Sequence, residues 1–245
     1  MSALAVLFIA IGIADIIRRL TPRLWLPVLS VPAVIVGCAA LAGLWRLGDI
    51  VLLAIAAVAG VCWVVLCARA ERTGERSVTP LVVFGVAAGL LLLLSGLASD
   101  VAGLVQRWFA WVGLSGVPGV DAERLLMIVG VVLLQMVTGN QLVRLVLGAI
   151  GAVKPAGEPQ PSDRLKGGRL LGPMERLLIL GLGLAGQLLA VSVVIAAKSI
   201  IRFPEINAQK ARENGNIGID DVVEYFLVGS FASWIVALGG LALAQ

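Results

Sequence analysis

The feature that most constrains this chain is a series of apolar segments, each about twenty residues long and almost free of charge. The clearest runs from Leu177 to Ala197 without a charged residue and follows Pro173, which is well tolerated in a first helical turn. A helix needs about 20 apolar residues to cross the hydrocarbon core of a bilayer. Hydrophobic residues make up 60% of the chain and charged residues 14%, whereas soluble domains have roughly 25% charged residues. We therefore expect an integral membrane protein.

The number of these segments predicts an all-α, polytopic transmembrane helix bundle of about seven spans, with six to eight allowed. The expected spans are Leu4–Ile17, Leu24–Leu44, Ile50–Ala68, Val78–Leu97, Leu125–Ile150, Leu177–Ala197 and Val222–Ala244. Residues 1–150 are expected to form an N-terminal bundle of five spans, and residues 170–245 a C-terminal helical hairpin of two. Residues 151–169 form a polar linker rich in Pro and Gly.

Two regions have more than one interpretation. Residues 103–118 place three aromatic residues beside Arg107 in an apolar run too short to cross, which favours an interfacial or re-entrant segment over a disordered loop. Residues 125–150 contain a polar interruption, formed by Gln135, Thr138, Asn140 and Gln141. This interruption indicates either a broken helix at membrane depth, or a span that ends near Gly139 before an amphipathic interfacial helix. We favour the second interpretation as the simpler one.

Three polar residues recur at intervals of eleven in the sixth expected span: Arg176, Gln187 and Lys198. Eleven steps of ~100° return to within about 20° of the starting direction, so the three share one face. A continuous helix separates the two cations by roughly 33 Å, which is close to the bilayer thickness. We expect them at opposite interfaces, with Gln187 near the midplane and facing protein or a polar cavity. The alternative is two snorkelling cations and a tolerated amide.

Small residues in the last two spans indicate close helix packing. The run GLGLAG at 181–186 matches a dinucleotide-binding pattern, but it lies inside an apolar helix whose N–H groups are already used. Gly229, Ser233 and Ala237 recur every four residues, a spacing that lets another helix approach closely.

Two ion pairs are expected at the ends of the spans. Asp15 is expected to pair with Arg176, or locally with Arg18 or Arg19, which are three and four residues on. Glu224 opens the last span and is expected to pair with Lys198 or Arg202 across the C-terminal hairpin. The alternative is that each of these side chains reaches water separately.

Three runs in the C-terminal region carry a family resemblance: ERLLI at 175–179, AAKSIIRF at 196–203 and EYFLVGSFASW at 224–234. Residues 168–240 resemble a bacterial multi-pass membrane family that is defined only as a domain of unknown function. That family often has a His before an Ala-Asp-Phe element, where this chain reads IGIADIIRR and contains no His. The resemblance implies an integral membrane fold and no particular activity.

Composition excludes several functions. The absence of His removes Ser-His and Cys-His catalysis and most transition-metal sites. Cys38, Cys62 and Cys67 lie inside apolar runs with no neighbouring ligand set, so we expect neither zinc nor a disulfide, and no other cofactor. The net charge of +4 indicates membrane topology and contact with lipid headgroups, and no nucleic-acid binding.

Three functions remain, and the first is a non-enzymatic membrane subunit that assembles with itself or with a membrane partner. The second is a channel or transporter for a small solute or ion, with a polar path near Gln187. The third is a lipid-modifying enzyme that uses Asp15, Glu175 or Glu224, which lacks paired acids at helical spacing. We rank them in this order and expect no enzymatic activity. The distribution of Lys and Arg over seven spans predicts a bacterial inner-membrane protein with its N-terminus outside and its C-terminus in the cytoplasm.

Overall fold

The computed structural model describes residues 1–74, 76–113, 121–152, 168–198, 200 and 219–245, without the side chains of 168, 169 and 219–224. Within these ranges the chain is helical and has no strand. The labelled helices are α1 (Ser2–Leu20), α2 (Trp25–Ala42), α3 (Leu47–Thr73), α4 (Val78–Leu93), α5 (Gly103–Trp111), α6 (Ala122–Leu133), α7 (Gly139–Ala149), α8 (Gly168–Leu184) and α10 (Ile219–Ala244). An apolar helix at Leu188–Lys198 carries no label. The all-α prediction is confirmed.

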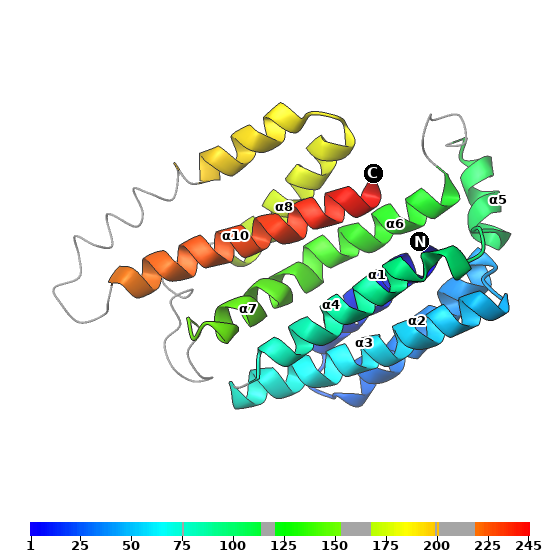
Figure 1. Cartoon of the computed structure of the whole chain (residues 1–245), viewed down its shortest axis with the longest axis horizontal. Helices are drawn as coiled ribbons and strands as arrows, with labels where there is room; N and C mark the ends of the chain where they lie inside the picture. The colour runs from blue at the N-terminus through cyan, green and yellow to red at the C-terminus, as the bar shows by residue number, and fades with distance from the viewer. Residues whose placement is uncertain (75, 114–120, 153–167, 199, 201–218) are drawn as a thin grey trace.

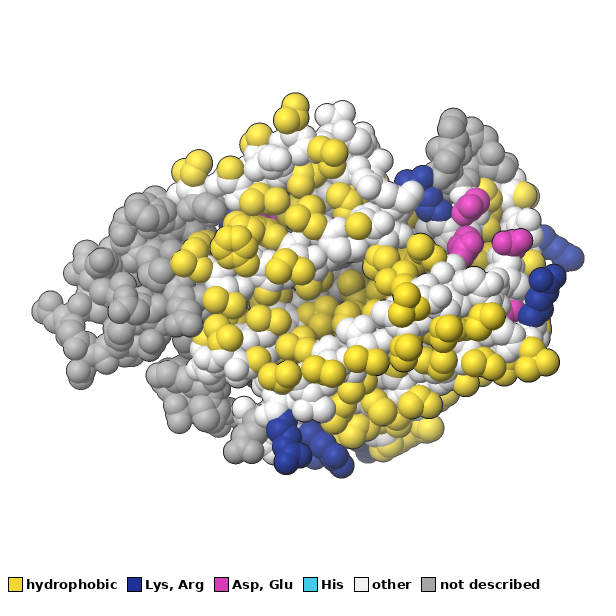
Figure 2. All heavy atoms as spheres, viewed as in Figure 1, with side chains coloured by type: hydrophobic (Ala, Val, Ile, Leu, Met, Phe, Trp, Pro, Cys, Tyr) yellow, Lys and Arg dark blue, Asp and Glu magenta, His cyan; other side chains and the backbone are white. Residues whose placement is uncertain are grey.

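Four helices are long and apolar enough to cross a membrane: Trp25–Ala42, Leu47–Thr73, Tyr225–Ala244 and the continuous rod Ala122–Ala149. The helices α1 and α4 lie alongside them in the bundle (Figure 1). Large apolar side chains cover the surface shown in Figure 2, and most of the charged side chains visible there lie toward the ends of the bundle. Such a surface suits a lipid environment. The four helices thus support a helical membrane protein, whereas the expected count of seven spans is not confirmed.

The core forms around α1, which is buried along most of its length and contacts α2, α3 and α6. Glycines permit the closest of these contacts. A Cβ atom on Gly130 of α6 would lie 2.8 Å from the carbonyl oxygen of Ala5, and one on Gly60 of α3 would lie 2.8 Å from a Val31 methyl group. Helix association in a membrane depends on such close backbone approach, because lipid is as apolar as the helix surfaces.

Polar contacts mark two ends of the bundle. At one end, which we call the terminal end, the Met1 amino group pairs with Glu123, and the Arg124 side chain donates to the Ala244 carbonyl oxygen. At the other, which we call the basic end, Arg18 at the end of α1 lies 3.4 Å from Glu71 at the end of α3. The start and the finish of the chain thus meet at one end of the bundle, which differs from the expected topology with termini on opposite sides.

The short helix α5 lies across the terminal end (Figure 1). It has nine residues, and Trp108 and Trp111 are exposed. The backbone N–H of Ala102, just before it, donates to the Ala42 carbonyl oxygen at the end of α2 (2.8 Å). A helix of this length does not cross a bilayer, which agrees with the interfacial interpretation of this region.

The sixth expected span is not continuous. The helix α8 ends at Leu184, and Gly186 has a φ of +73°, a left-handed conformation that glycine adopts readily. The N–H of Gln187 then donates to the Leu182 carbonyl oxygen (2.8 Å), and the Leu188–Lys198 helix runs back beside α8. The single helix expected from Leu177 to Ala197 is therefore replaced by a helical hairpin.

Candidate functional site

The polar interruption in the fifth expected span forms a π-helix at Leu134–Thr138, between α6 and α7. The N–H of Gly139 reaches the Leu134 carbonyl oxygen, five residues back, so this turn is one residue wider than an α-helical turn. The rod neither breaks nor ends near Gly139, so both interpretations of this region were wrong about its continuity. The sequence did locate the irregularity.

Three of the four residues named for this interruption point into the bundle: Gln135, Thr138 and Gln141 are buried. The Gln135 side chain donates through Nε2 to the Val236 carbonyl oxygen of α10 (2.8 Å). Gly240 makes this contact possible, because a Cβ atom there would lie 2.3 Å from the same nitrogen. The amide oxygen of Gln135 has no hydrogen-bond partner among the described residues.

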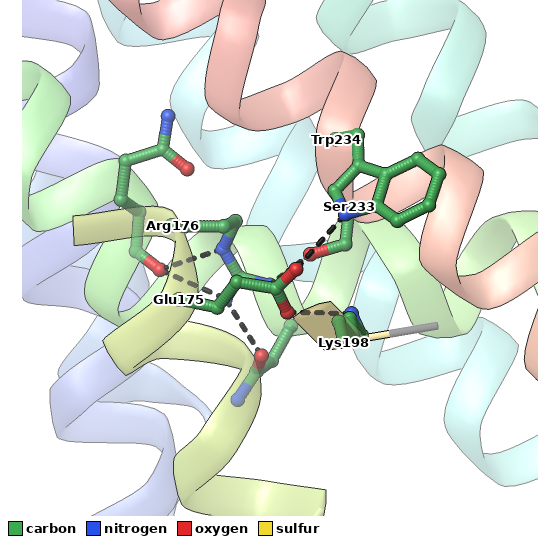
Figure 3. A network of polar contacts seen from close by, with 7 residues as sticks. Glu175, Arg176, Lys198, Ser233 and Trp234 are labelled. Carbon is green, nitrogen blue, oxygen red and sulfur yellow. Dashed lines mark hydrogen bonds and ion pairs between the residues drawn. The ribbon is translucent and has the colours of Figure 1, made fainter. Parts of the chain in front are cut away.

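Arg176 of α8 inserts its guanidinium group beside this π-helix (Figure 3). The side chain is 2% exposed. Its Nε and Nη2 both donate to the backbone carbonyl oxygen of Gln135 (3.1 and 2.8 Å), Nη2 also donates to Asn140 Oδ1 (2.7 Å), and Nη1 donates to Ser233 Oγ of α10 (3.1 Å). Every acceptor is neutral. Within the described part of the chain, no carboxylate forms an ion pair with this arginine.

Two glycines lie beside the guanidinium group, and one of them, Gly139, leaves room for it. A Cβ atom on Gly139 would lie 2.8 Å from Arg176 Nε and 3.0 Å from its Cζ, and one on Gly172 would lie 3.4 Å from Nη1. The first distance is too short for any real side chain, so Gly139 is required where the arginine now lies. The second is an ordinary van der Waals contact.

A second cluster adjoins this arginine and holds the hairpin against α10 (Figure 3). Glu175 Oε2 lies 2.5 Å from Lys198 Nζ, and Trp234 Nε1 donates to Glu175 Oε1 (2.9 Å). The Lys198 ammonium also lies 5.8 Å from the centre of the Trp234 ring, within the range of a cation–π contact. The reversal of the chain at Gly186 brings the two ends of the hairpin together. The expectation that Arg176 and Lys198 lie at opposite interfaces was therefore wrong.

Gln187 lies in the exposed turn of the hairpin. The prediction that it faces protein or a polar cavity near the midplane was wrong, because the helix that was to carry it inward ends three residues earlier. Arg202 and the side chain of Glu224 lie outside the described residues, so the expected pairing of Glu224 with Lys198 or Arg202 stays a prediction. Within the described residues, Lys198 pairs with Glu175.

Asp15 of α1 lies in another buried cluster, which adjoins Thr138 of the π-helix. Its carboxylate lies 3.1 Å from Arg18 and accepts a bond from Trp63 Nε1 of α3 (3.3 Å). Arg18 also lies 3.4 Å from Glu71, so these three side chains together carry one net negative charge. The local pairing of Asp15 is confirmed, and Arg176 is not its partner.

Arg19, the next residue of α1, binds the π-helix from the basic end. Its Nη2 donates to the Val137 carbonyl oxygen (2.8 Å), two residues from the carbonyl that Arg176 binds. Two arginines from different helices thus bind neighbouring carbonyl groups of one irregular turn. The sequence offered one signal for this site, the interruption QMVTGN, but no signal for the cations that bind it.

The chemistry available here is recognition by charge and hydrogen bonds. The site contains guanidinium, ammonium, amide, indole and hydroxyl groups around one carboxylate. Within the described ranges, no group of three or more Cys, Asp or Glu residues is arranged to hold a metal ion. The small residues of α10 face the neighbouring helices. Ser233 accepts a hydrogen bond from Arg176. Gly229 packs against Leu147 of α7, and Ala237 is buried against α8.

Comparison with protein-family models, with curated proteins and with solved structures finds no match for this chain. The resemblance of residues 168–240 to a bacterial membrane family therefore stays a prediction.

Proposed function

We propose that this chain is an integral protein of the bacterial inner membrane through which a small solute or ion passes, with the contact between the π-helix and Arg176 as its polar centre. One observation carries the proposal: a guanidinium group is buried in the bundle and has no carboxylate partner among the described residues. Its acceptors Gln135 and Ser233 lie near the middle of Ala122–Ala149 and Ile219–Ala244, which corresponds to mid-bilayer depth.

An arginine at the centre of a membrane helix costs about 2.5–3.5 kcal/mol on insertion scales, so such residues are functional candidates. The surrounding backbone supports this interpretation. The site adjoins a π-helix and a helical hairpin that reverses at Gly186, and irregular helices near the midplane are typical of transport proteins. The unpartnered amide oxygen of Gln135 adds an acceptor that a solute or water can use.

This proposal moves the polar path away from Gln187, which is exposed, to the buried residues around Arg176. A role as a non-enzymatic subunit was favoured by the small-residue stripe of α10. Ser233 and Ala237 of that stripe pack inside the chain, so the stripe does not indicate a surface for self-assembly.

Charge at the two ends supports an orientation. Among the described residues, the basic end exposes six arginines, and the terminal end has three arginines and four acidic residues. The arginines of the basic end are Arg19, Arg23, Arg69, Arg72, Arg76 and Arg144. The residues of the terminal end are Arg46, Arg107, Arg124, Asp49, Asp100, Asp121 and Glu123. By the positive-inside rule the basic end faces the cytoplasm, and both termini face away from it.

Flux in reconstituted vesicles tests the function. Purified protein in liposomes should pass at least one small solute or ion from a panel of anions, cations and neutral solutes. The Arg176→Gln variant should lose most of this flux, while Ser192→Ala should retain it, because within the described ranges the Ser192 hydroxyl donates only to the Leu188 carbonyl oxygen of its own helix. Equal flux in protein-free vesicles and in vesicles containing the unmodified protein would refute the proposal.

Single-cysteine labelling in a cysteine-free background tests the orientation. Cysteines placed at the exposed positions Asp100 and Gln245 of the terminal end should react with a membrane-impermeant maleimide from the same side, and one placed at Thr73 should react from the opposite side. Labelling of Asp100 and Gln245 from opposite sides would exclude this arrangement.

A further inference from the structure

We propose that Arg176 is the binding site of a small monovalent anion, which makes an anion the species that passes the polar centre. The inference rests on the proposed function, because it names the substrate class of the same site. It follows from the charge, the hydrogen-bond donors and the depth of the arginine.

The charge of Arg176 is not balanced by its contacts. Glu175, its neighbour along the chain, is bound by Lys198 at 2.5 Å and by the Trp234 indole. Asp15, the other buried carboxylate on this side of the bundle, pairs with Arg18. The four contacts of the guanidinium group go to a backbone carbonyl, an amide oxygen and a hydroxyl. One positive charge therefore remains in a medium of low dielectric constant, where a counter-ion is bound strongly.

Two hydrogen-bond donors remain next to each other for such an ion. A guanidinium group has five N–H bonds, and the contacts of Arg176 use one on Nε, two on Nη2 and one on Nη1. The second N–H of Nη1 is left over. Ser233 accepts from Nη1 at 3.1 Å, so its own O–H is directed elsewhere and can donate to an anion. An anion between α8 and α10 would receive both bonds.

A second positive charge, that of Arg19, lies between the site and the basic end. Arg19 is exposed there and binds the Val137 carbonyl oxygen, while Arg176 binds the carbonyl oxygen of Gln135. The same π-helix thus binds two cations, and the second, Arg19, lies on the side of the basic end. A field of this sign raises the local concentration of anions and repels cations.

The single charge of Arg176 selects for a monoanion. A dianion would leave a net negative charge at mid-depth, beside the Glu175 carboxylate and the carbonyl groups of the π-helix. Lipid headgroups lie at the bilayer surface, so the ligand is a diffusible ion. Halides, nitrate and short carboxylates share the required chemistry.

Binding is tested with the purified full-length chain in detergent, by its thermal unfolding midpoint in sodium chloride, nitrate, acetate or sulfate at equal ionic strength. We expect a saturable rise with monoanions and none with sulfate. Stabilisation by acetate alone identifies a carboxylate ligand, and stabilisation by chloride or nitrate an inorganic one. Arg176→Gln should weaken the apparent affinity at least about tenfold, and Ser233→Ala about two- to tenfold. Ser192→Ala serves as the control and should leave it unchanged.

Ser233→Ala keeps the proposal testable if Arg176→Gln does not fold. Equal stabilisation by all salts, or an unchanged response in Ser233→Ala and in any folded Arg176 variant, would overturn the anion site. The vesicle panel separates the two proposals. Flux of cations or neutral solutes without anion-dependent stabilisation would refute the anion site and leave the proposed function. Anion-dependent stabilisation without flux would refute the proposed function and leave a binding site.

Discussion

The contact between α1 and α6 gives the sharpest prediction about stability. Gly130→Ala would place a Cβ atom 2.8 Å from the Ala5 carbonyl oxygen and 3.2 Å from Phe8 Cβ. Neither atom is the free end of a flexible side chain, so the two helix backbones must separate by several tenths of an ångström. Overpacking of this kind costs about 1–3 kcal/mol. This cost is partly offset, because the higher helix propensity of Ala stabilises a helix by about 1 kcal/mol relative to Gly.

Gly85→Ala in α4 supplies the matched control, because a Cβ atom there would meet no atom within 4 Å. It should gain about 1 kcal/mol from helix propensity alone. The two variants should therefore differ in free energy of unfolding by about 1–3 kcal/mol, with Gly130→Ala the less stable. Unfolding in detergent by titration with a denaturing surfactant measures this difference. If Gly130→Ala were as stable as Gly85→Ala, the close packing of α1 on α6 would be wrong.

Three further predictions concern the polar sites. Asp15→Asn removes the ion pair of a carboxylate that is 1% exposed, so it should lower the free energy of unfolding by about 1–3 kcal/mol. An unchanged thermal unfolding midpoint would contradict this. Glu175→Lys should destabilise the hairpin by about 1–3 kcal/mol, and adding Lys198→Glu should restore most of this stability. A double variant that is no more stable than Glu175→Lys alone would exclude the ion pair. Gly139→Ala should displace the Arg176 guanidinium group and reduce solute flux as strongly as Arg176→Gln does, whereas flux at the unmodified level would show that the guanidinium position does not matter.

Local features of the chain were predicted well from the residues. The apolar segments, the short interfacial helix near Trp108 and the irregular turn around Gln135 all follow from composition over a few helical turns. The pairing of Asp15 with Arg18 is also local, since residues three apart on a helix are neighbours whatever surrounds them. Helix formation in lipid satisfies every backbone group within its own segment, so such features depend little on the rest of the fold.

The reversal at Gly186 did not follow from the sequence. A glycine in an apolar run is compatible with a continuing helix, as Gly130 and Gly183 show by packing inside their helices. Once the chain turns back, Lys198 meets Glu175, and Gln187 is exposed at the turn. The expected orientation of the C-terminus in a membrane stays a prediction.

The sequence by itself determined that the chain is helical and apolar enough to span a membrane, where most of its helices lie and where one of them is irregular. Only the tertiary structure decided which helix faces meet, which acceptors bind Arg176, and that both termini lie at one end. The physical reason is that lipid and protein interior are equally apolar, so hydropathy identifies a membrane helix without distinguishing its buried face from its lipid-facing one. The partners of a buried arginine depend on those faces, and Ser233 and Gln135 reach Arg176 only after three separate helices have packed together.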